Sequence, residues 1–219
     1  IADILGSTFS ENTAEGGSGG AILNSQGTLN VTNSTFSENT AEGGGAILNH
    51  HGGILTIKNG TISGNAALHG GGIWNIGTMS ISNTILANST LGDDCYNHDG
   101  ATISLNINNL IESNAASPNN CGFASISKDP GLRQLTDNGG STPTMALLPG
   151  SPAINAGNDA FCPATDQRGV ARPQGSHCDI GAYEYDQAPP TLNPAGISFQ
   201  EVIGGLVNPV FITHAKDGS

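Results

Sequence analysis

The chain has 219 residues and a formal net charge of −12, from 18 acidic residues against 6 lysines and arginines. A surface this acidic repels phosphate backbones, which argues against nucleic acid as a partner. No apolar run approaches the roughly 20 residues needed to span a bilayer, so we expect no membrane-spanning segment. The chain opens inside a repeat and without a methionine, so the lack of a signal peptide does not argue against export.

A short phrase of sequence recurs in the first part of the chain. Variants of Ser-Thr-Phe-Ser-Glu-Asn-Thr occur at residues 7–13, 34–40 and 60–65. Glycines followed by apolar residues and an asparagine occur at 20–24, 45–49 and 72–75. Such self-similarity at a fixed period is typical of a solenoid, in which each unit buries its apolar face against its neighbours.

Three columns of residues share one spacing, of 26, 24 and 26 positions. They are Leu29, Leu55, Met79 and Leu105; Val31, Ile57, Ile81 and Ile107; and Asn33, Asn59, Asn83 and Asn109. Apolar and polar residues alternate around the first members, as in a strand with one buried face. We therefore predict an all-β chain that folds as a right-handed parallel β-helix, with about 25 residues per rung. Phe9, Phe36 and Ile62 form a further predicted interior file.

Asparagine recurs at two places in each repeat, and both are predicted to be turns. The columns are Asn33, Asn59, Asn83 and Asn109, and Asn24, Asn49 and Asn75. We interpret both as structural ladders, in which side-chain amides of successive rungs hydrogen-bond to one another. A polar binding strip is the alternative.

Trp74 occupies the place that Leu23 and Leu48 hold in the earlier repeats, beside a column of isoleucines. If side chains alternate strictly along the strand, one of these two columns faces outward. Trp74 is therefore a candidate contact residue, with packing in the core or at an edge as the alternative.

The four cysteines indicate an oxidising compartment. Cys95 and Cys121 lie one repeat apart, so stacking of rungs would place their backbones about 5 Å from each other, within disulfide range. Cys162 and Cys178 form the second natural pair. Zinc is the weaker alternative because the chain has no Cys-x-x-Cys motif. Disulfides favour a secreted or surface location.

After about residue 115 the periodic pattern gives way to turn-rich sequence, which we expect to form irregular coils and a cap over 116–186. Within it, the segments 151–157, 166–169, 172–173 and 178–184 resemble the C-terminal signature of bacterial surface β-helix proteins called choice-of-anchor Q domain proteins. The glycine-rich repeats are also similar to polymorphic outer-membrane protein repeats. Covering roughly residues 1–186, this resemblance implies a right-handed β-helix exported to the bacterial exterior, usually without assigned catalysis.

The charged residues of that signature have two interpretations. They are Asp166, Arg168, Arg172, Asp179 and Glu184. In a chain with so few basic residues, we expect them to form hydrogen-bonded ion pairs that hold the cap down. The alternative is a pocket for an anionic or sugar ligand.

Residues 187–219 form a separate predicted region, which begins with a Pro-rich linker. Residues 202–219 resemble the opening strand of glucose/sorbosone dehydrogenase-type β-propellers but include none of that family's catalytic or quinone-binding positions. The resemblance implies a chain that precedes a propeller in a longer polypeptide, or that was cut at this point.

Catalysis has one local indication. Gly92-Asp93-Asp94 resembles the paired-aspartate element of polygalacturonase-like hydrolases, but Asn83-Thr84-Ile85 stands where a partner Asn-Thr-Asp would be expected. A lyase would need a basic residue near clustered carboxylates, and the rungs offer only Lys58. Asp93, Asp94 and Asp99 are instead candidate ligands of a weak loop calcium site, the one cofactor we consider.

We predict a non-catalytic extracellular module with a structural or adhesive function and with surface glycans or further copies of the chain as partners. A β-helix that opens in mid-rung exposes unpaired backbone, so end-to-end assembly into a filament is one hypothesis, with residues 197–213 as the added strand. The alternative function is a β-helix that binds or cleaves polysaccharides, as pectinase-like hydrolases and lyases do.

Overall fold

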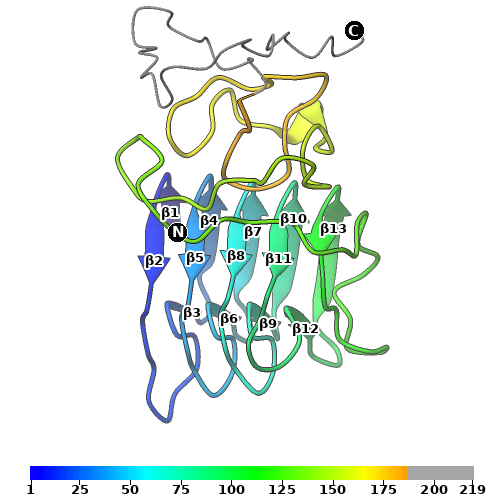
Figure 1. The fold of residues 1–219 in the computed structure, drawn as a ribbon. Coiled ribbons are helices and arrows are strands. Elements are labelled where there is room, and N and C mark those ends of the chain that lie inside the picture. The colour runs from blue at the N-terminus through cyan, green and yellow to red at the C-terminus, as the bar shows by residue number, and fades with distance from the viewer. Residues whose placement is uncertain (187–219) are drawn as a thin grey trace, which may run out of the picture. The chain divides into compact units, whose positions relative to one another are not determined.

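The computed structural model describes residues 1–186, and the predicted linker and tail at 187–219 lie outside this part. The predicted solenoid is confirmed: strands from successive repeats pair in parallel and form three sheets (Figure 1). Leu29 pairs with Leu55 and Leu55 with Met79, as the repeat spacing predicted. Each rung therefore contributes one short strand to each sheet, and the corners between the strands are tight turns.

Each sheet contains every third strand along most of the chain. The first sheet has the order β1 (Ala2–Leu5), β4 (Thr28–Thr32), β7 (Ile54–Lys58), β10 (Thr78–Ser82), β13 (Thr102–Ile107). The second has the order β2 (Thr8–Ser10), β5 (Thr35–Ser37), β8 (Thr61–Ser63), β11 (Ile85–Ala87), β14 (Leu110–Ile111). The third has the order β3 (Ile22–Asn24), β6 (Ile47–Asn49), β9 (Ile73–Asn75), β12 (Cys95–Asn97).

Side chains of one kind stack inside the coil because equivalent residues of each rung lie above one another. In β4, Leu29 and Val31 are buried while Thr28, Asn30 and Thr32 are partly exposed, which matches the predicted alternation. The phenyl rings of Phe9 and Phe36 stack with centroids 4.9 Å apart, and Ile62 continues this file. The interior is thus a set of apolar files.

The fifth rung, which contains β13, departs from the predicted register by one residue. Met79 pairs with Ile103 but Ser80 pairs with Leu105, so the strand pair contains a bulge. The extra residue is Ser104, whose hydroxyl donates to the Met79 carbonyl at 3.1 Å and lies 2.8 Å from the Ser80 hydroxyl. The predicted alignments of Met79 with Leu105, Ile81 with Ile107 and Asn83 with Asn109 are therefore wrong, because a bulge adds a residue without ending the pairing.

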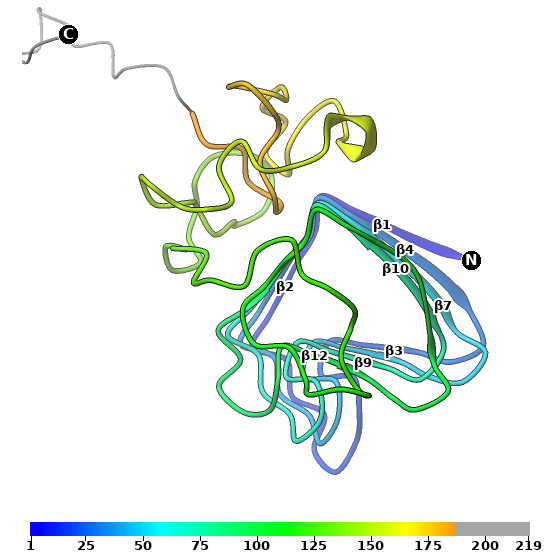
Figure 2. The same ribbon diagram turned by 90° about the vertical axis from the view of Figure 1, so that its right-hand side faces the viewer.

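The irregular sequence after β14 has two places in the fold. Its first part covers the last rung, where Asn114 bridges to Cys95 and Ile126 to Leu110. Residues 129–186, which we call the C-terminal strap, lie along the corner between the first and second sheets, as the end-on view shows (Figure 2).

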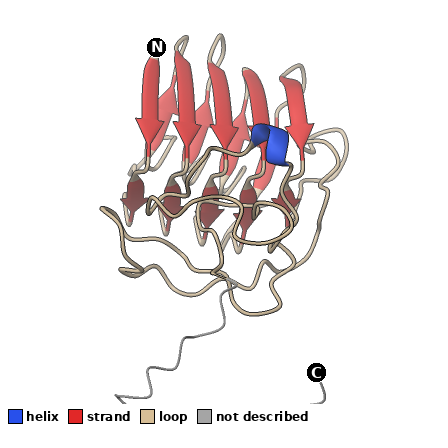
Figure 3. Ribbon diagram, turned by 90° about the horizontal axis from the view of Figure 1, so that it is seen from above, coloured by secondary structure: helices blue, strands red, loops and turns tan. Residues whose placement is uncertain are grey.

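The strap packs through a small core of its own, in which Leu147, Ala153 and Ile180 meet Ile85 and Leu110 of the solenoid. It reaches back to the first rung, where the Thr142 hydroxyl donates to the Gly6 carbonyl. Its 3-10 turn at Asp159–Phe161 is the single helical element of residues 1–186 (Figure 3).

Candidate functional site

Both predicted disulfides are present. Cys95–Cys121 ties β12 to the loop that covers the last rung, with 6.0 Å between the Cα atoms. Cys162–Cys178 closes a loop within the strap. The first therefore fixes the end of the solenoid and the second shapes the strap.

Replacing Cys121 by serine should destabilise the chain, because the disulfide closes a loop with a sequence separation of 26. We expect the free energy of unfolding to fall by about 3 kcal/mol, from the restored loop entropy of the unfolded chain. Urea titration of the variant beside the oxidised parent measures this. An unchanged midpoint would mean that the bridge adds nothing to the folded state.

Two asparagine ladders run inside the solenoid. In the third sheet, each side-chain amide donates to the amide oxygen of the next rung, at distances of 2.8, 2.7 and 2.7 Å. Its members are Asn24, Asn49, Asn75 and Asn97. This is the predicted ladder with one further rung.

The second ladder was not predicted. Asn12 donates to Asn39 at 2.8 Å and Asn39 to Asn65 at 2.9 Å. The recurrent Ser-Glu-Asn sequence is the pattern from which this ladder could have been predicted. Apart from the exposed Asn12 and the partly exposed Asn97, the amides of both ladders are shielded from water and bonded within the ladders, so their function is structural.

The other predicted ladder is wrong, and its asparagines hold the strap instead. Asn33, Asn59, Asn83 and Asn108, which we call the corner row, all have positive φ, between 46° and 50°. Their side chains donate to carbonyls of the strap: Asn33 to Thr165 at 2.7 Å, Asn59 to Asp179 and Gly181 at 3.1 and 3.3 Å, Asn83 to Asn158 at 3.1 Å, and Asn108 to Ala156 at 3.0 Å. Within the row, the described residues show one long contact, of 3.5 Å, between Asn83 and Asn59.

Asn109 does not belong to the corner row. It lies inside the coil, where its amide donates to the Ile81 carbonyl and its oxygen accepts from the Thr84 amide. The bulge explains this, because the added residue places Asn108 at the corner in its stead.

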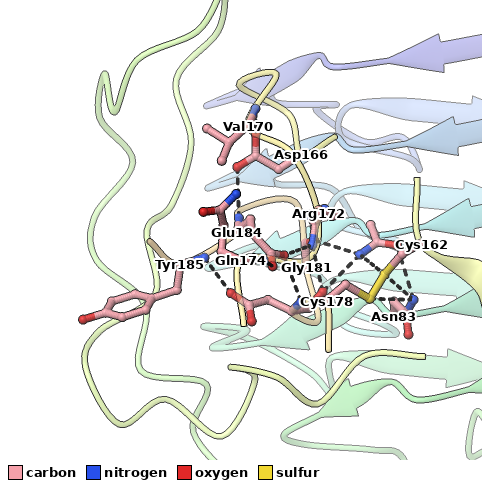
Figure 4. Close-up of polar contacts among 12 residues, drawn as sticks. Asn83, Cys162, Asp166, Val170, Arg172, Gln174, Cys178, Gly181, Glu184 and Tyr185 are labelled. Carbon is pink, nitrogen blue, oxygen red and sulfur yellow. Dashed lines mark hydrogen bonds and ion pairs between the residues drawn. A yellow bond between two sulfur atoms is a disulfide. The ribbon is translucent and has the colours of Figure 1, made fainter. Parts of the chain in front are cut away.

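Five charged residues of the strap form a buried cluster, which we call the clasp (Figure 4). They are Asp166, Arg168, Arg172, Asp179 and Glu184. The Arg172 guanidinium donates to the Glu184 carboxylate at 2.8 Å and to the carbonyls of Asp179 and Gly181 at 2.9 and 2.7 Å. Both partners of this ion pair are fully buried. Asp166 and Arg168 form the second pair at 2.7 Å, with the guanidinium 3.6 Å from the Tyr183 ring centroid.

Asp179 has a different role from the predicted one. Its carboxylate accepts backbone amides of Asn155 and Tyr185 at 2.7 and 2.6 Å rather than a basic side chain. The groups of the clasp thus bind one another and the strap backbone, which favours the structural interpretation over a ligand pocket.

Stability should depend on pH through Asp179. Burial raises the pKa of this carboxyl from 3.8 to about 6, assisted by the Glu184 charge and opposed by the two amide bonds and Arg172. Because the folded state then binds more protons than the unfolded state between about pH 4 and 6, stability falls as pH rises through 6. We expect about 1 kcal/mol more stability at pH 5 than at pH 7.5.

Urea titrations at the two pH values measure this difference. Asp179→Asn should reduce it, whereas Asp137→Asn, at an exposed turn of the strap, should leave it unchanged. Equal pH dependence in both variants would contradict the assignment to Asp179.

The predicted calcium ligands do not assemble a site. Asp94 is fully buried, and its carboxylate accepts the backbone amides of Ser89 and Ser113 at 2.9 and 2.7 Å. Asp99 lies on an exposed turn. Asp93, Asp94 and Asp99 are not a metal-binding group, and no three His, Cys, Asp or Glu side chains within residues 1–186 form one. The paired-aspartate element likewise has one carboxylate already committed to the backbone.

Trp74 lies in an aromatic patch on the outer face of the third sheet. Leu23, Leu48, Trp74 and Tyr96 are neighbours in register. Leu23 is 55% exposed and Leu48 only 4%. The Trp74 ring is half-buried and covers Gly43, where a Cβ would meet it at 2.2 Å.

Two histidines flank this indole, with ring centroids 5.3 Å away for His69 and 6.3 Å away for His98. We call Trp74, Tyr96, His69 and His98 the aromatic patch. Its rings pack largely on one another, so Trp74 is less available for contact than a fully exposed residue would be.

A groove of about 570 Å³ lies between the solenoid and the strap. One wall comes from the corners that follow β5, β8 and β11, and the other from the paired strap segments around Leu132 and Leu147. Its lining residues are Ser37, Glu38, Thr40, Ser63, Gly64, Asn88, Thr90, Leu132, Arg133, Gln134 and Met145. The sequence did not predict this site, because its two walls lie far apart in the chain.

Together the paired sheets, the ladders and the disulfides define a parallel β-helix of the repeat class. The family model described as the Chlamydia polymorphic membrane protein repeat matches residues 6–25 and 33–50, which belong to the first two rungs. These rungs are thus similar to polymorphic membrane protein repeats. No curated protein and no solved structure matches the chain. No helix in residues 1–186 has the length and apolar character needed to cross a membrane.

Proposed function

We propose that the chain is a non-catalytic module of the bacterial exterior that acts as an adhesive surface, with surface glycans as ligands. The observation that carries the proposal is the repeat match in the first two rungs, since it relates the solenoid to membrane proteins. The two disulfides support an oxidising exterior location. A stack of rungs also offers long lateral faces for binding.

The proposal also includes two relations to known protein families. The strap sequence supports a relation to choice-of-anchor Q domain proteins, and residues 202–219 support a propeller opening beyond a β-helical domain at 1–186. In the adhesive module, the strap stiffens one corner of the solenoid, and the aromatic patch is a contact surface on the third sheet.

Assembly of copies remains a separate part of the proposal. The last rung is covered by residues of the same chain, so a second copy would have to add at the first rung, where Leu5 and Leu23 are exposed. Sedimentation velocity over a range of concentrations tests this: growing species would support assembly, and a constant monomer would refute it.

Adhesion is testable with the full 219-residue chain on beads. Coated beads should adhere to glycan-bearing cell surfaces, and antibodies to the solenoid should label intact cells of the source organism. Beads carrying reduced and alkylated chain are the control. Labelling confined to permeabilised cells, or adhesion equal to that control, would refute the proposal.

A further inference from the structure

The groove between solenoid and strap has walls that are already held in place. On the solenoid side, residues 38, 64 and 88 occupy the same turn position in three successive rungs, all with positive φ. Gly64 has no side chain, and the Glu38 Cγ lies 3.6 Å from the place that a Cβ of Gly64 would take. On the strap side, the Arg133 amide donates to the Ala146 carbonyl at 2.8 Å. A ligand would therefore meet a site that is already formed.

The groove contains two charged side chains of opposite sign without a partner. Glu38 and Arg133 are both exposed, and neither side chain makes a hydrogen bond or ion pair within the described part of the chain. Every other Arg in residues 1–186 is bound to a carboxylate. Arg133 is thus the guanidinium that remains available to a ligand, and it stands opposite a free carboxylate.

The remaining lining favours a sugar over a peptide. Its exposed hydroxyls and amides both donate and accept hydrogen bonds, and they come from Thr40, Asn88, Thr90 and Gln134, while Ser37 and Ser63 are buried. An extended peptide would bind by adding to an unpaired backbone edge. Here the backbone is already paired, since the Ser37 carbonyl accepts from Glu11 and the Ala87 carbonyl from Gly64.

The net charge of the chain further limits the class of ligand that the groove can bind. A net charge of −12 repels a polymer that carries an acid on every unit. One guanidinium can nonetheless bind one carboxylate in a bidentate manner. We propose that this groove binds a short oligosaccharide that carries a single carboxylate, with Arg133 on the acid and Glu38 accepting from sugar hydroxyls. This site rests on the adhesive function proposed above and gives it a ligand class.

Binding of three soluble probes to the full chain tests the site by titration calorimetry. Sialyllactose has one carboxylate, lactose has none, and oligogalacturonate has one on every unit. We expect sialyllactose to bind about tenfold more tightly than lactose, because lactose has no carboxylate to accept the charged hydrogen bond from Arg133. Oligogalacturonate should bind no better than lactose.

Variants assign the binding to the groove. Arg133→Gln should abolish the preference for sialyllactose over lactose, and Glu38→Gln should weaken both about tenfold. Glu11→Gln is the matched control, since Glu11 has the same turn conformation one rung away but does not line the groove. Lys128→Gln removes one positive charge from an exposed position outside it.

The possible outcomes distinguish a failure of the groove proposal from a failure of the proposed adhesive function. Sialyllactose binding that survives Arg133→Gln, or no binding of any probe while coated beads still adhere, would overturn the groove and leave the adhesive module standing. Probe binding with the expected variant pattern, without bead adhesion, would support the groove and refute adhesion. If Trp74→Ala alone abolishes binding, the ligand lies on the aromatic patch and the groove proposal is overturned.

Discussion

Replacing Arg172 by methionine should lower the free energy of unfolding by about 4 kcal/mol, which we expect to be the largest effect of any single substitution in the clasp. The change leaves the fully buried Glu184 carboxylate without its counter-charge. It also removes a donor to the Asp179 and Gly181 carbonyls, to which Asn59 of the corner row donates as well. Urea unfolding followed by circular dichroism measures the loss.

Lys128→Met is the control for this experiment. It removes a positive charge and adds the same apolar side chain at an exposed position, so its effect should stay within about 0.5 kcal/mol. If Arg172→Met and Lys128→Met unfold at the same urea concentration, the clasp does not hold the strap.

Replacing Asn49 by alanine should cost about 3 kcal/mol. Its amide donates to Asn75 at 2.7 Å and to the Thr78 carbonyl at 3.0 Å, and its oxygen accepts from Asn24. The substitution leaves these buried groups unsatisfied, and the cost of that exceeds the value of the bonds themselves. Thermal and urea unfolding of the variant measure it.

Asn30→Ala is the matched control, because Asn30 lies on the outer face of the first sheet and bonds to Asp3 at an exposed position. We expect a change within about 0.5 kcal/mol. An equal loss of unfolding free energy in the two variants would show that the interior ladder stabilises the fold no more than an exposed hydrogen bond does.

The interior files were predictable because they depend on neighbouring repeats alone. The columns through Leu29 and Phe36 rest on strand alternation and on a constant spacing, both of which are visible in the sequence. The shift at Ser104 was not visible, since apolar residues at 105 and 107 continue the column even though the strand has gained a residue.

Two asparagine columns looked alike in sequence and have different functions. The Asn49 column points into the coil from a strand end, while the corner row adopts a left-handed conformation and faces the strap. Nothing in the repeats distinguishes these, because the partner of Asn33 is Thr165, a residue of a segment without periodicity. The groove could not be predicted for the same reason: it exists only once the strap lies beside the rungs.

Amide hydrogen exchange of the full chain tests most directly whether the strap is latched along the solenoid. The Gly181 amide donates to the Asn83 carbonyl at 2.8 Å, and the Ala182 amide to the Thr61 hydroxyl at 2.9 Å, so both bonds join the strap to the solenoid. We predict that both exchange as slowly as amides of the central strands β5 and β8. Exchange at the rate of an unstructured peptide at these two positions, with protected strands, would contradict the account.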